Sequence, residues 1–340
     1  MRYRMVGNTD LTISEIGFGC GGNAGLMVRG DLRQQIGVIE RAIALGVTYF
    51  DTAPDYGDGK AEENLARALR ELCLRPVINS KVEIRAADLG DIASNVVGSA
   101  EKSLRRLGIE QLDMFQVHNG PSCSPSSLRG NDYRQLWLRD FLRPGGACEG
   151  IRRLKETGKI RHAGFICRGD DADAVAALLD TGLFSLINVP YTLLNPTAGH
   201  PRPVRLEARD FGNVIEIAMR RGASAAIYSP LGGGFLTASF LTGAASHPVA
   251  RQIDVAAPAA QLAATRVAKL AFLPDEGESL AQAAYRFILS NPGVATVLGG
   301  FSAIEQVEEL AAVSGRGPIA PDKMRRLEAL WDSNFDAHVG

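Results

Sequence analysis

Short apolar runs alternate with longer segments of helical period along almost the whole chain. Eight such runs are each followed by a polar loop, a pattern typical of buried strands. The runs are SEIGFG, VTYFD, PVINSK, LDMFQVH, IRHAGFI, SLINV, SAAIYS and VATVLGG. Between them, the spacing of apolar residues predicts amphipathic helices, among them Leu32 to Ala44, Glu62 to Leu72, Ile92 to Leu107 and Ala172 to Leu179. The pattern therefore predicts eight βα units.

Eight consecutive βα units close into a TIM barrel, and a doubly wound open sheet is the competing architecture. The open sheet normally carries G-x-G-x-x-G at its first strand-to-helix turn, and Gly17, Gly19 and Gly22 match that spacing. A long stretch up to Asp31 nevertheless separates these glycines from the next predicted helix, so no helix N-terminus follows them to receive a pyrophosphate. We therefore predict one (β/α)8 TIM-barrel domain over residues 1–340, with the glycines in a loop that lines its site.

Composition narrows the class of partner. The chain has 37 basic and 38 acidic residues spread along its length, and this balance favours a small-molecule partner over nucleic acid or a membrane surface. The five cysteines include no C-x-x-C pair, which fits reduced thiols. The N-terminus lacks the apolar core of a signal peptide, and no stretch of about 18 apolar residues occurs. We expect a soluble, cytoplasmic protein.

Ionisable side chains end three consecutive predicted strands. Asp51 ends the second strand, Lys81 the third and His118 the fourth, while Tyr56 lies in the loop after Asp51. Each residue alone has an ordinary structural explanation, such as capping a turn or reaching solvent. Their separations are each about one βα unit, so a barrel brings all four together at the carboxyl ends of its strands, where the chemistry of this fold takes place.

The four side chains suit proton transfer at an alcohol or carbonyl oxygen. A phenol has an ordinary pKa of about 10, and a neighbouring Lys81 ammonium is expected to lower the pKa of Tyr56. Asp51 would keep Lys81 charged, and His118 could donate a hydrogen bond to a substrate oxygen. None of these groups supplies a hydride, so redox chemistry would require a bound nicotinamide.

The chain resembles the aldo-keto reductases from MRYRMVGNTDLTISEIGFG at its start to EQVEEL near Leu310. Its FDTAPDYG is similar to the Asp-Thr-Ala…Tyr-Gly motif of that family. The resemblance implies a TIM barrel with an N-terminal β-hairpin and an NAD(P)(H) cofactor across its C-terminal face. It also implies that Asp51, Tyr56, Lys81 and His118 form a catalytic tetrad, in which Tyr56 is the general acid and base for reduction of an aldehyde, ketone or sugar carbonyl.

Cofactor contacts are carried over from the same resemblance. NVPYTLLN is similar to the family's strand with a tyrosine that stacks on the nicotinamide, which points to Tyr191, although Tyr191 could also be an ordinary rim aromatic. IYSPLGGGFLT is similar to the segment over the pyrophosphate, and GGFSAIEQVEEL to the adenosine segment. The implied cofactor-binding residues are Asp51, Cys167, Asn188, Tyr191, Ser229, Leu231, Gly232, Gly300, Ser302, Gln306 and Glu309.

Several positions depart from the family pattern. Ile166 and Cys167 stand where Ser-Asn is common, and an isoleucine side chain cannot hydrogen-bond a carboxamide. Asn188 replaces the usual glutamine, and Leu310 replaces an asparagine. These changes affect the expected contacts to the nicotinamide carboxamide and to adenine.

The adenosine segment also bears on which dinucleotide binds. Members that prefer the 2′-phosphorylated cofactor commonly have basic residues where this chain has Ser302 and Gln306. A hydroxyl and an amide offer only neutral hydrogen bonds to a phosphate, and three glutamates lie nearby. The sequence therefore favours NAD(H) at least as much as NADP(H), unless Arg251 or another loop residue reaches the adenosine.

Three other functions share this architecture or this resemblance. A Schiff-base aldolase would need a neutral Lys81, which an adjacent Asp51 opposes. A metal-dependent hydrolase needs clustered ligands, but the five histidines are widely separated. A redox-sensing auxiliary barrel that binds the nucleotide and turns over slowly is the third.

Long loops set the substrate in this fold. The longest predicted loops are residues 119–146, which include Trp137 and Phe141, and residues 197–209. If Trp137 lines the site, an apolar or aromatic carbonyl compound, or a sugar packed on the indole, is favoured. A helix-face position in the core is the other possibility for Trp137.

Overall fold

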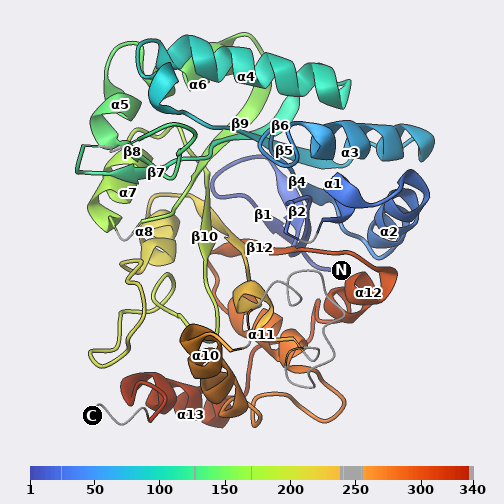
Figure 1. The fold of residues 1–340 in the computed structure, drawn as a ribbon, viewed down its shortest axis with the longest axis vertical. Coiled ribbons are helices and arrows are strands. Elements are labelled where there is room, and N and C mark those ends of the chain that lie inside the picture. Colours follow the sequence, from blue (N-terminus) through green and yellow to red (C-terminus); the bar gives the residue numbers. More distant parts are fainter. Residues whose placement is uncertain are drawn as a thin grey trace.

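The computed structural model describes residues 1–23, 25–125, 128–169, 171–237, 240, 254 and 256–336. Eight parallel strands form a closed barrel, as predicted, and the open sheet is ruled out (Figure 1). Each predicted apolar run coincides with one strand of the barrel, and the third and sixth strands each extend one residue beyond their run, to Val82 and Pro190. The strands are β3 Ile16–Gly19, β4 Tyr49–Asp51, β5 Val77–Val82, β6 Leu112–Val117, β9 Ile160–Ile166, β10 Leu186–Pro190, β11 Ser224–Tyr228 and β12 Val294–Gly299.

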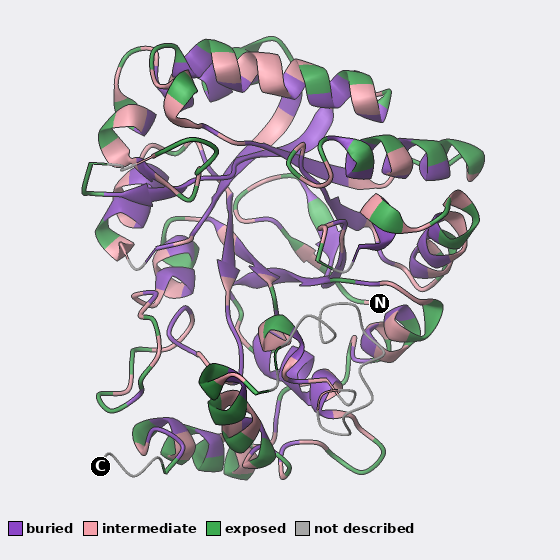
Figure 2. Ribbon diagram, in the orientation of Figure 1, coloured by how far each residue is buried: buried purple, intermediate pink, exposed green. Residues whose placement is uncertain are grey.

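Helices cover the outside of the barrel. Figure 2 shows that the strands are buried and that the helices around them expose their outer faces. Three of the predicted helices have the predicted bounds, and α3 begins two residues earlier than predicted. These helices are α2 Leu32–Ala44, α3 Lys60–Glu71, α4 Ile92–Leu107 and α7 Ala172–Leu179; the other helices packed around the strands are α6 Ala147–Glu156, α8 Val214–Arg220, α11 Leu280–Leu289 and α12 Ile304–Ala311. Asp31 begins α2 because its carboxylate accepts a hydrogen bond from the backbone N–H of Gln34.

Shorter elements occur in the loops. The stretch before Asp31 contains α1 Leu26–Arg29, and residues 119–146 contain β7 Gly120–Ser122, β8 Gln135–Trp137 and α5 Leu138–Leu142. Near the C-terminus lie α10 Pro258–Ala268 and α13 Pro321–Asp332. No helix in the described parts of the chain has the length and apolar character needed to cross a membrane.

A hairpin closes the N-terminal end of the barrel. It consists of β1 Tyr3–Met5 paired antiparallel with β2 Thr12–Ser14. The side chain of Ile13 is fully buried, in one apolar cluster with residues inside the barrel such as Met114 and Leu186. Arg4 fixes the hairpin to the barrel, since its guanidinium donates 2.9 Å and 2.8 Å hydrogen bonds to the carbonyls of Val294 and Leu289. The opposite end of the barrel is left for a site.

We expect the hairpin to contribute to stability through Ile13. Ile13→Ala should lower the free energy of unfolding by about 2–5 kcal/mol, because it removes a buried side chain and leaves a cavity. Thr12→Ala, on the exposed face of the same strand, is the matched control. Denaturant midpoints measure both variants, and equal midpoints would show that the hairpin does not close the core.

Candidate active site

A cavity of about 660 Å³ opens at the carboxyl ends of the barrel strands. The four predicted catalytic residues all line it, and so does the glycine-rich loop after β3, as predicted. Of the predicted cofactor contacts, most line it as well. The lining residues that the sequence singled out are Asp51, Tyr56, Lys81, His118, Ile166, Asn188, Ser229, Leu231, Gly300, Gln306, Glu309 and Leu310.

A chain of hydrogen bonds connects Asp51, Lys81 and Tyr56. The Lys81 ammonium lies 2.5 Å from Oδ1 of Asp51, and both side chains are almost completely buried. Lys81 also donates to the carbonyl of Thr52 at 2.7 Å and to the Tyr56 hydroxyl at 3.2 Å. Its three donors are therefore all used, and the ammonium is fixed against the phenol.

Amide side chains hold the other oxygen of Asp51. Oδ2 accepts hydrogen bonds from Asn79 at 2.7 Å and from Asn188 at 3.1 Å. Gln116 connects the two asparagines, since it accepts from Asn79 and donates to Asn188, both at 2.8 Å. Asn188, predicted to hold a cofactor carboxamide, thus also supports the carboxylate beneath the cavity.

The pKa of Tyr56 differs from the value expected from the sequence, which was a pKa lowered by Lys81. Burial raises the pKa of Tyr56 above its ordinary value, and the Lys81 charge opposes this rise without cancelling it. Burial disfavours the charged form of Lys81, yet Asp51 and Tyr56 together raise its pKa above the ordinary value. Lys81 is therefore held as an ammonium, which a Schiff-base aldolase could not use.

Glu83 contacts His118 and was missed from the sequence. Its Oε1 lies 2.7 Å from Nδ1 of His118, and both side chains are buried. Burial, aided by the Asp55 charge, raises the pKa of Glu83 to about 7 against the charges of Lys81 and Arg85. Burial and the Lys81 charge hold the pKa of His118 well below its usual range. The position of Glu83 in the sequence could have indicated this contact. Side chains two residues apart on an extended chain face the same side, so Glu83 faces the same side as Lys81.

The aromatic ring at the cavity wall differs from the predicted one. Tyr191 does not line the cavity; it is buried in the core, where its ring lies 4.8 Å from that of Phe287. Tyr228, the last residue of β11, lines the cavity instead, and its hydroxyl lies 3.3 Å from the carbonyl of Cys167. Both tyrosines follow an apolar run in the sequence, so local pattern did not separate them.

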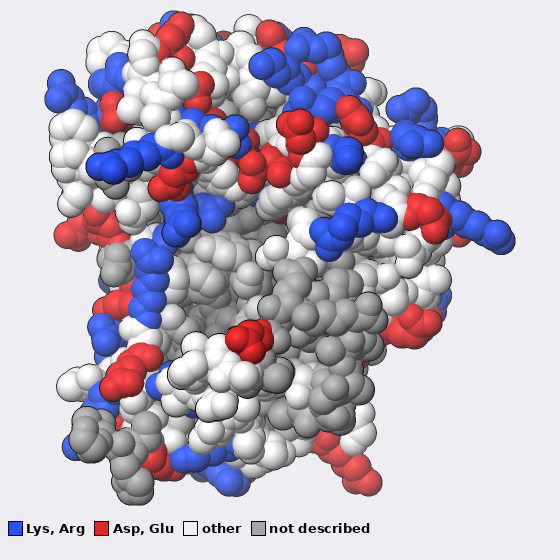
Figure 3. Space-filling view, viewed as in Figure 1, with Lys and Arg blue, Asp and Glu red and all other residues white. Residues whose placement is uncertain are grey.

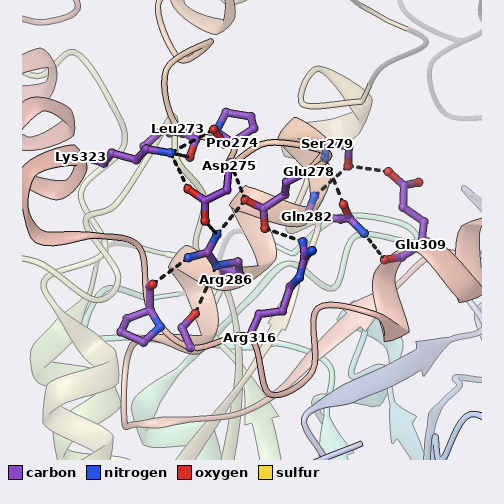
Figure 4. Close-up of polar contacts among 12 residues, drawn as sticks. Leu273, Pro274, Asp275, Glu278, Ser279, Gln282, Arg286, Glu309, Arg316 and Lys323 are labelled. Atoms are coloured by element: carbon purple, nitrogen blue, oxygen red, sulfur yellow. Dashed lines mark hydrogen bonds and ion pairs between the residues drawn. The ribbon is translucent and has the colours of Figure 1, made fainter.

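The adenosine segment borders the end of the cavity formed by α12. The backbone N–H and the hydroxyl of Ser302 donate to Oε1 of Gln306 at 2.8 Å and 3.1 Å. Glu309 is held by α11, since Ser279 donates to its carboxylate at 2.6 Å and Gln282 to its carbonyl at 2.8 Å (Figure 4). Next to it, Arg286 binds Asp275 and Glu278 and so holds the segment that leads into α11.

Three more of the residues singled out from the sequence lie away from the cavity wall. Cys167 is buried and does not line the cavity. Gly232 does not line it either, although its neighbours Leu231 and Gly233 do. Ser302 contacts it only through Gln306. Arg251 lies outside the described residues.

The long loop after β6 contributes Tyr133 to the cavity. Phe141 is fully buried, and Trp137 donates its indole N–H to the carbonyl of Cys123 at 3.2 Å without lining the cavity. The Tyr133 ring lies 5.0 Å from that of His118, and its hydroxyl donates to Asp55 at 2.6 Å. Trp137 therefore does not meet the condition under which a substrate packed on its indole was considered.

Known proteins resemble this chain in sequence and fold. The family model described as Aldo/keto reductase family matches residues 15–332. An L-glyceraldehyde 3-phosphate reductase of Escherichia coli O157:H7 is 26% identical, over 99% of this chain and 96% of that protein. An aldo-keto reductase from Bacillus halodurans, in its holo form, superposes with a TM-score of 0.72 at 20% identity, covering 97% and 96% of the two chains. One from Klebsiella pneumoniae in complex with NADPH gives 0.66 at 21% identity, covering 98% and 96%.

The raised pKa of Glu83 predicts a change in the His118 tautomer. Below about pH 7 the Glu83 carboxyl is protonated and donates to Nδ1, so neutral His118 carries its proton on Nε2. Above this pH the carboxylate accepts from Nδ1–H, and Nε2 becomes an acceptor. Nitrogen-15 NMR of the His118 ring should show this exchange between about pH 6 and 8. In Glu83→Gln the ring signals should not titrate; an unchanged titration would assign the effect to another group.

Proposed function

The chain belongs to the aldo/keto reductase family, and from this premise we propose that it is an NAD(P)(H)-dependent oxidoreductase. It interconverts an aldehyde, ketone or sugar carbonyl and the corresponding alcohol, with Tyr56 as the general acid and base. The observation that carries the proposal is the chain from Asp51 through Lys81 to the Tyr56 hydroxyl, which ends at a cavity that His118 also lines.

The wall of the cavity fits an extended dinucleotide. Gly233 has a φ of 73°, and an added Cβ there meets no atom within 4 Å, so a side chain would project into open space. A Cβ on Gly21 would lie 3.9 Å from Cζ of Tyr56, in the space above the phenol. Both glycines line the cavity, so bare backbone leaves room there, and at Gly21 that room lies beside the phenol.

We assign the cofactor contacts along this wall. Tyr228, in place of Tyr191, supplies an aromatic face for the nicotinamide, and Ser229 and Leu231 begin the segment over the pyrophosphate. Asp51 and Asn188 border the nicotinamide end, while the buried Cys167 contributes only its backbone carbonyl, which accepts from the Tyr228 hydroxyl. Gly232 belongs to the pyrophosphate segment, and Gly300, Ser302, Gln306 and Glu309 to the adenosine end.

The bound nicotinamide would supply or accept the hydride. In reduction, Tyr56 donates its proton to the substrate oxygen as negative charge develops there. The Lys81 ammonium stabilises the phenolate that remains, and Asp51 keeps the ammonium in place. His118, with its proton on Nε2, donates a hydrogen bond to the same substrate oxygen. In oxidation the phenolate takes the proton of the alcohol.

The adenosine end supports use of NAD(H). Gln306 already accepts two hydrogen bonds from Ser302, and Glu309 adds a carboxylate to the cavity wall, so neither residue offers a positive charge to a 2′-phosphate. The Klebsiella pneumoniae structure contains NADPH, so the comparisons do not favour this preference. The proposal rests on this chain's own residues.

Tyr56→Phe should lower kcat by about 100- to 10,000-fold, because it removes the proton donor of the transition state. Affinity for the reduced cofactor should stay nearly unchanged, as measured by protein fluorescence. The assay follows nicotinamide absorbance with a panel of aldehydes, ketones and sugars, in both directions. Near-normal kcat in the variant would refute the mechanism, and a wild-type protein that binds cofactor but turns over slowly on every substrate would point to the auxiliary barrel.

NADH should bind within about tenfold of NADPH, a difference of roughly 1.4 kcal/mol or less. Fluorescence titration of both reduced cofactors at fixed salt measures this ratio. Ser302→Arg should shift it toward NADPH by supplying a guanidinium, and Ser302→Ala should not. If NADPH binds the unaltered protein much more than tenfold tighter, a basic residue outside this segment supplies the clamp.

A further inference from the structure

A second cavity, of about 470 Å³, adjoins the first and is rich in arginine. Arg168 and Tyr228 line both cavities, so these two side chains form a common border between them. Arg134 and Arg209 also line the second cavity, against one acidic residue, Asp132. In the space-filling view, Lys and Arg side chains follow one side of a hollow in this face of the molecule (Figure 3). Among the described residues that line the second cavity, arginines therefore outnumber acidic residues.

Arg168 is held at the junction of the two cavities. Its Nε donates to the backbone carbonyl of His118 at 2.9 Å, and its guanidinium carbon lies 5.2 Å from the centre of the Tyr133 ring. These contacts fix the side chain but do not neutralise it, because no carboxylate among the described residues forms an ion pair with Arg168. A half-buried guanidinium of this kind is well suited to bind a planar or tetrahedral oxyanion.

The two other arginines contribute differently. Arg134 lies 3.8 Å from Asp132, so part of its charge is balanced within the cavity. The Arg209 guanidinium carbon lies 5.7 Å from the centre of the Phe211 ring. The charges of Arg168 and Arg209 both oppose the burial that raises the pKa of Tyr228 to about 12.

From this geometry we propose that the second cavity binds an anionic group of the substrate, with Arg168 as the principal contact. The inference rests on the proposed function and narrows it: the substrate is a carbonyl compound that carries a carboxylate or a phosphate a short distance from the carbonyl. The carbonyl lies at Tyr56 and His118, and the anionic group lies beyond Arg168 in the second cavity. Ser122 and Gln135 line that cavity and add neutral hydrogen-bonding groups.

Matched substrate pairs test the proposal. Succinic semialdehyde is compared with its methyl ester, and glyceraldehyde 3-phosphate with glyceraldehyde, so that each pair differs in the anionic group. We expect kcat/KM to be at least about tenfold higher for one anionic member than for its neutral partner, with the preference shrinking as salt is raised. The pair with the larger ratio of anionic to neutral kcat/KM shows whether the cavity prefers a carboxylate or a phosphate. Equal values in both pairs would overturn the inference while leaving the oxidoreductase assignment intact.

Substitutions test whether the preference for the anionic substrate comes from Arg168. Arg168→Met should remove most of the anionic preference, and Arg168→Lys should restore part of it, because a lysine keeps the charge but loses the two-pronged geometry. Arg205→Met is the matched control, since Arg205 is exposed in the same long loop as Arg209 and lines neither cavity. An anionic preference that survives in Arg168→Met would also overturn the assignment.

A binding measurement keeps the proposal testable without turnover. Calorimetric titration with succinate and with inorganic phosphate, in the presence of saturating cofactor, should show binding of at least one anion to the unaltered protein and weaker binding to Arg168→Met. If neither anion binds, the second cavity is not an anion site. If an anion binds through Arg168 but no carbonyl compound is reduced, the inference about the cavity holds and the proposed function fails.

Discussion

The buried ion pair between Lys81 and Asp51 is the interaction on which the site depends. Neither charge is stable in the barrel interior alone, and removing one partner of such a pair typically costs about 3–5 kcal/mol because the other is left uncompensated. Asn79, Gln116 and Asn188 complete the hydrogen bonding of the carboxylate, so β4, β5, β6 and β10 all contribute to one polar network. The closed barrel fixes this network, and the network fixes the phenol of Tyr56.

His118 has an acidic residue on one side and a basic residue on the other. Glu83 faces Nδ1, while Arg168 donates to the backbone carbonyl of the same residue and raises the positive charge around it. A carboxyl with a pKa of about 7 beside a histidine whose pKa is strongly lowered lets the pair exchange one proton near neutrality without creating a buried imidazolium. We therefore expect the protonation of Glu83 to decide whether Nε2 of His118 donates or accepts.

The strands, several helix bounds and the four central side chains could be predicted from the sequence, because strand ends and spacings of one βα unit are local properties of the chain. Other parts of the site could not be predicted, because they depend on where each side chain points in the folded chain. Tyr191 and Tyr228 both follow apolar runs, but only Tyr228 lines the cavity. Trp137 lies in a long loop, yet its indole turns toward Cys123 rather than the site. Glu83 has an ordinary surface residue type, and only burial beside His118 makes it part of the site.

The segment after β9 connects these differences to substrate choice. Ile166 lines the first cavity with an apolar side chain, and Cys167 is buried in the core. Arg168, the residue after Cys167, lines both cavities. A segment that in related proteins commonly offers two polar side chains to the cofactor here offers none, and it presents a guanidinium to the space beyond instead. Because Arg168 donates to the backbone carbonyl of His118, any group that binds Arg168 is placed next to the residue that we propose orients the substrate carbonyl. Under the proposed function, recognition of a distant charge and alignment of the reacting oxygen would be carried by two adjoining loops, the one after β6 and the one after β9. Binding energy from a nonreacting group could in this way position the reacting one.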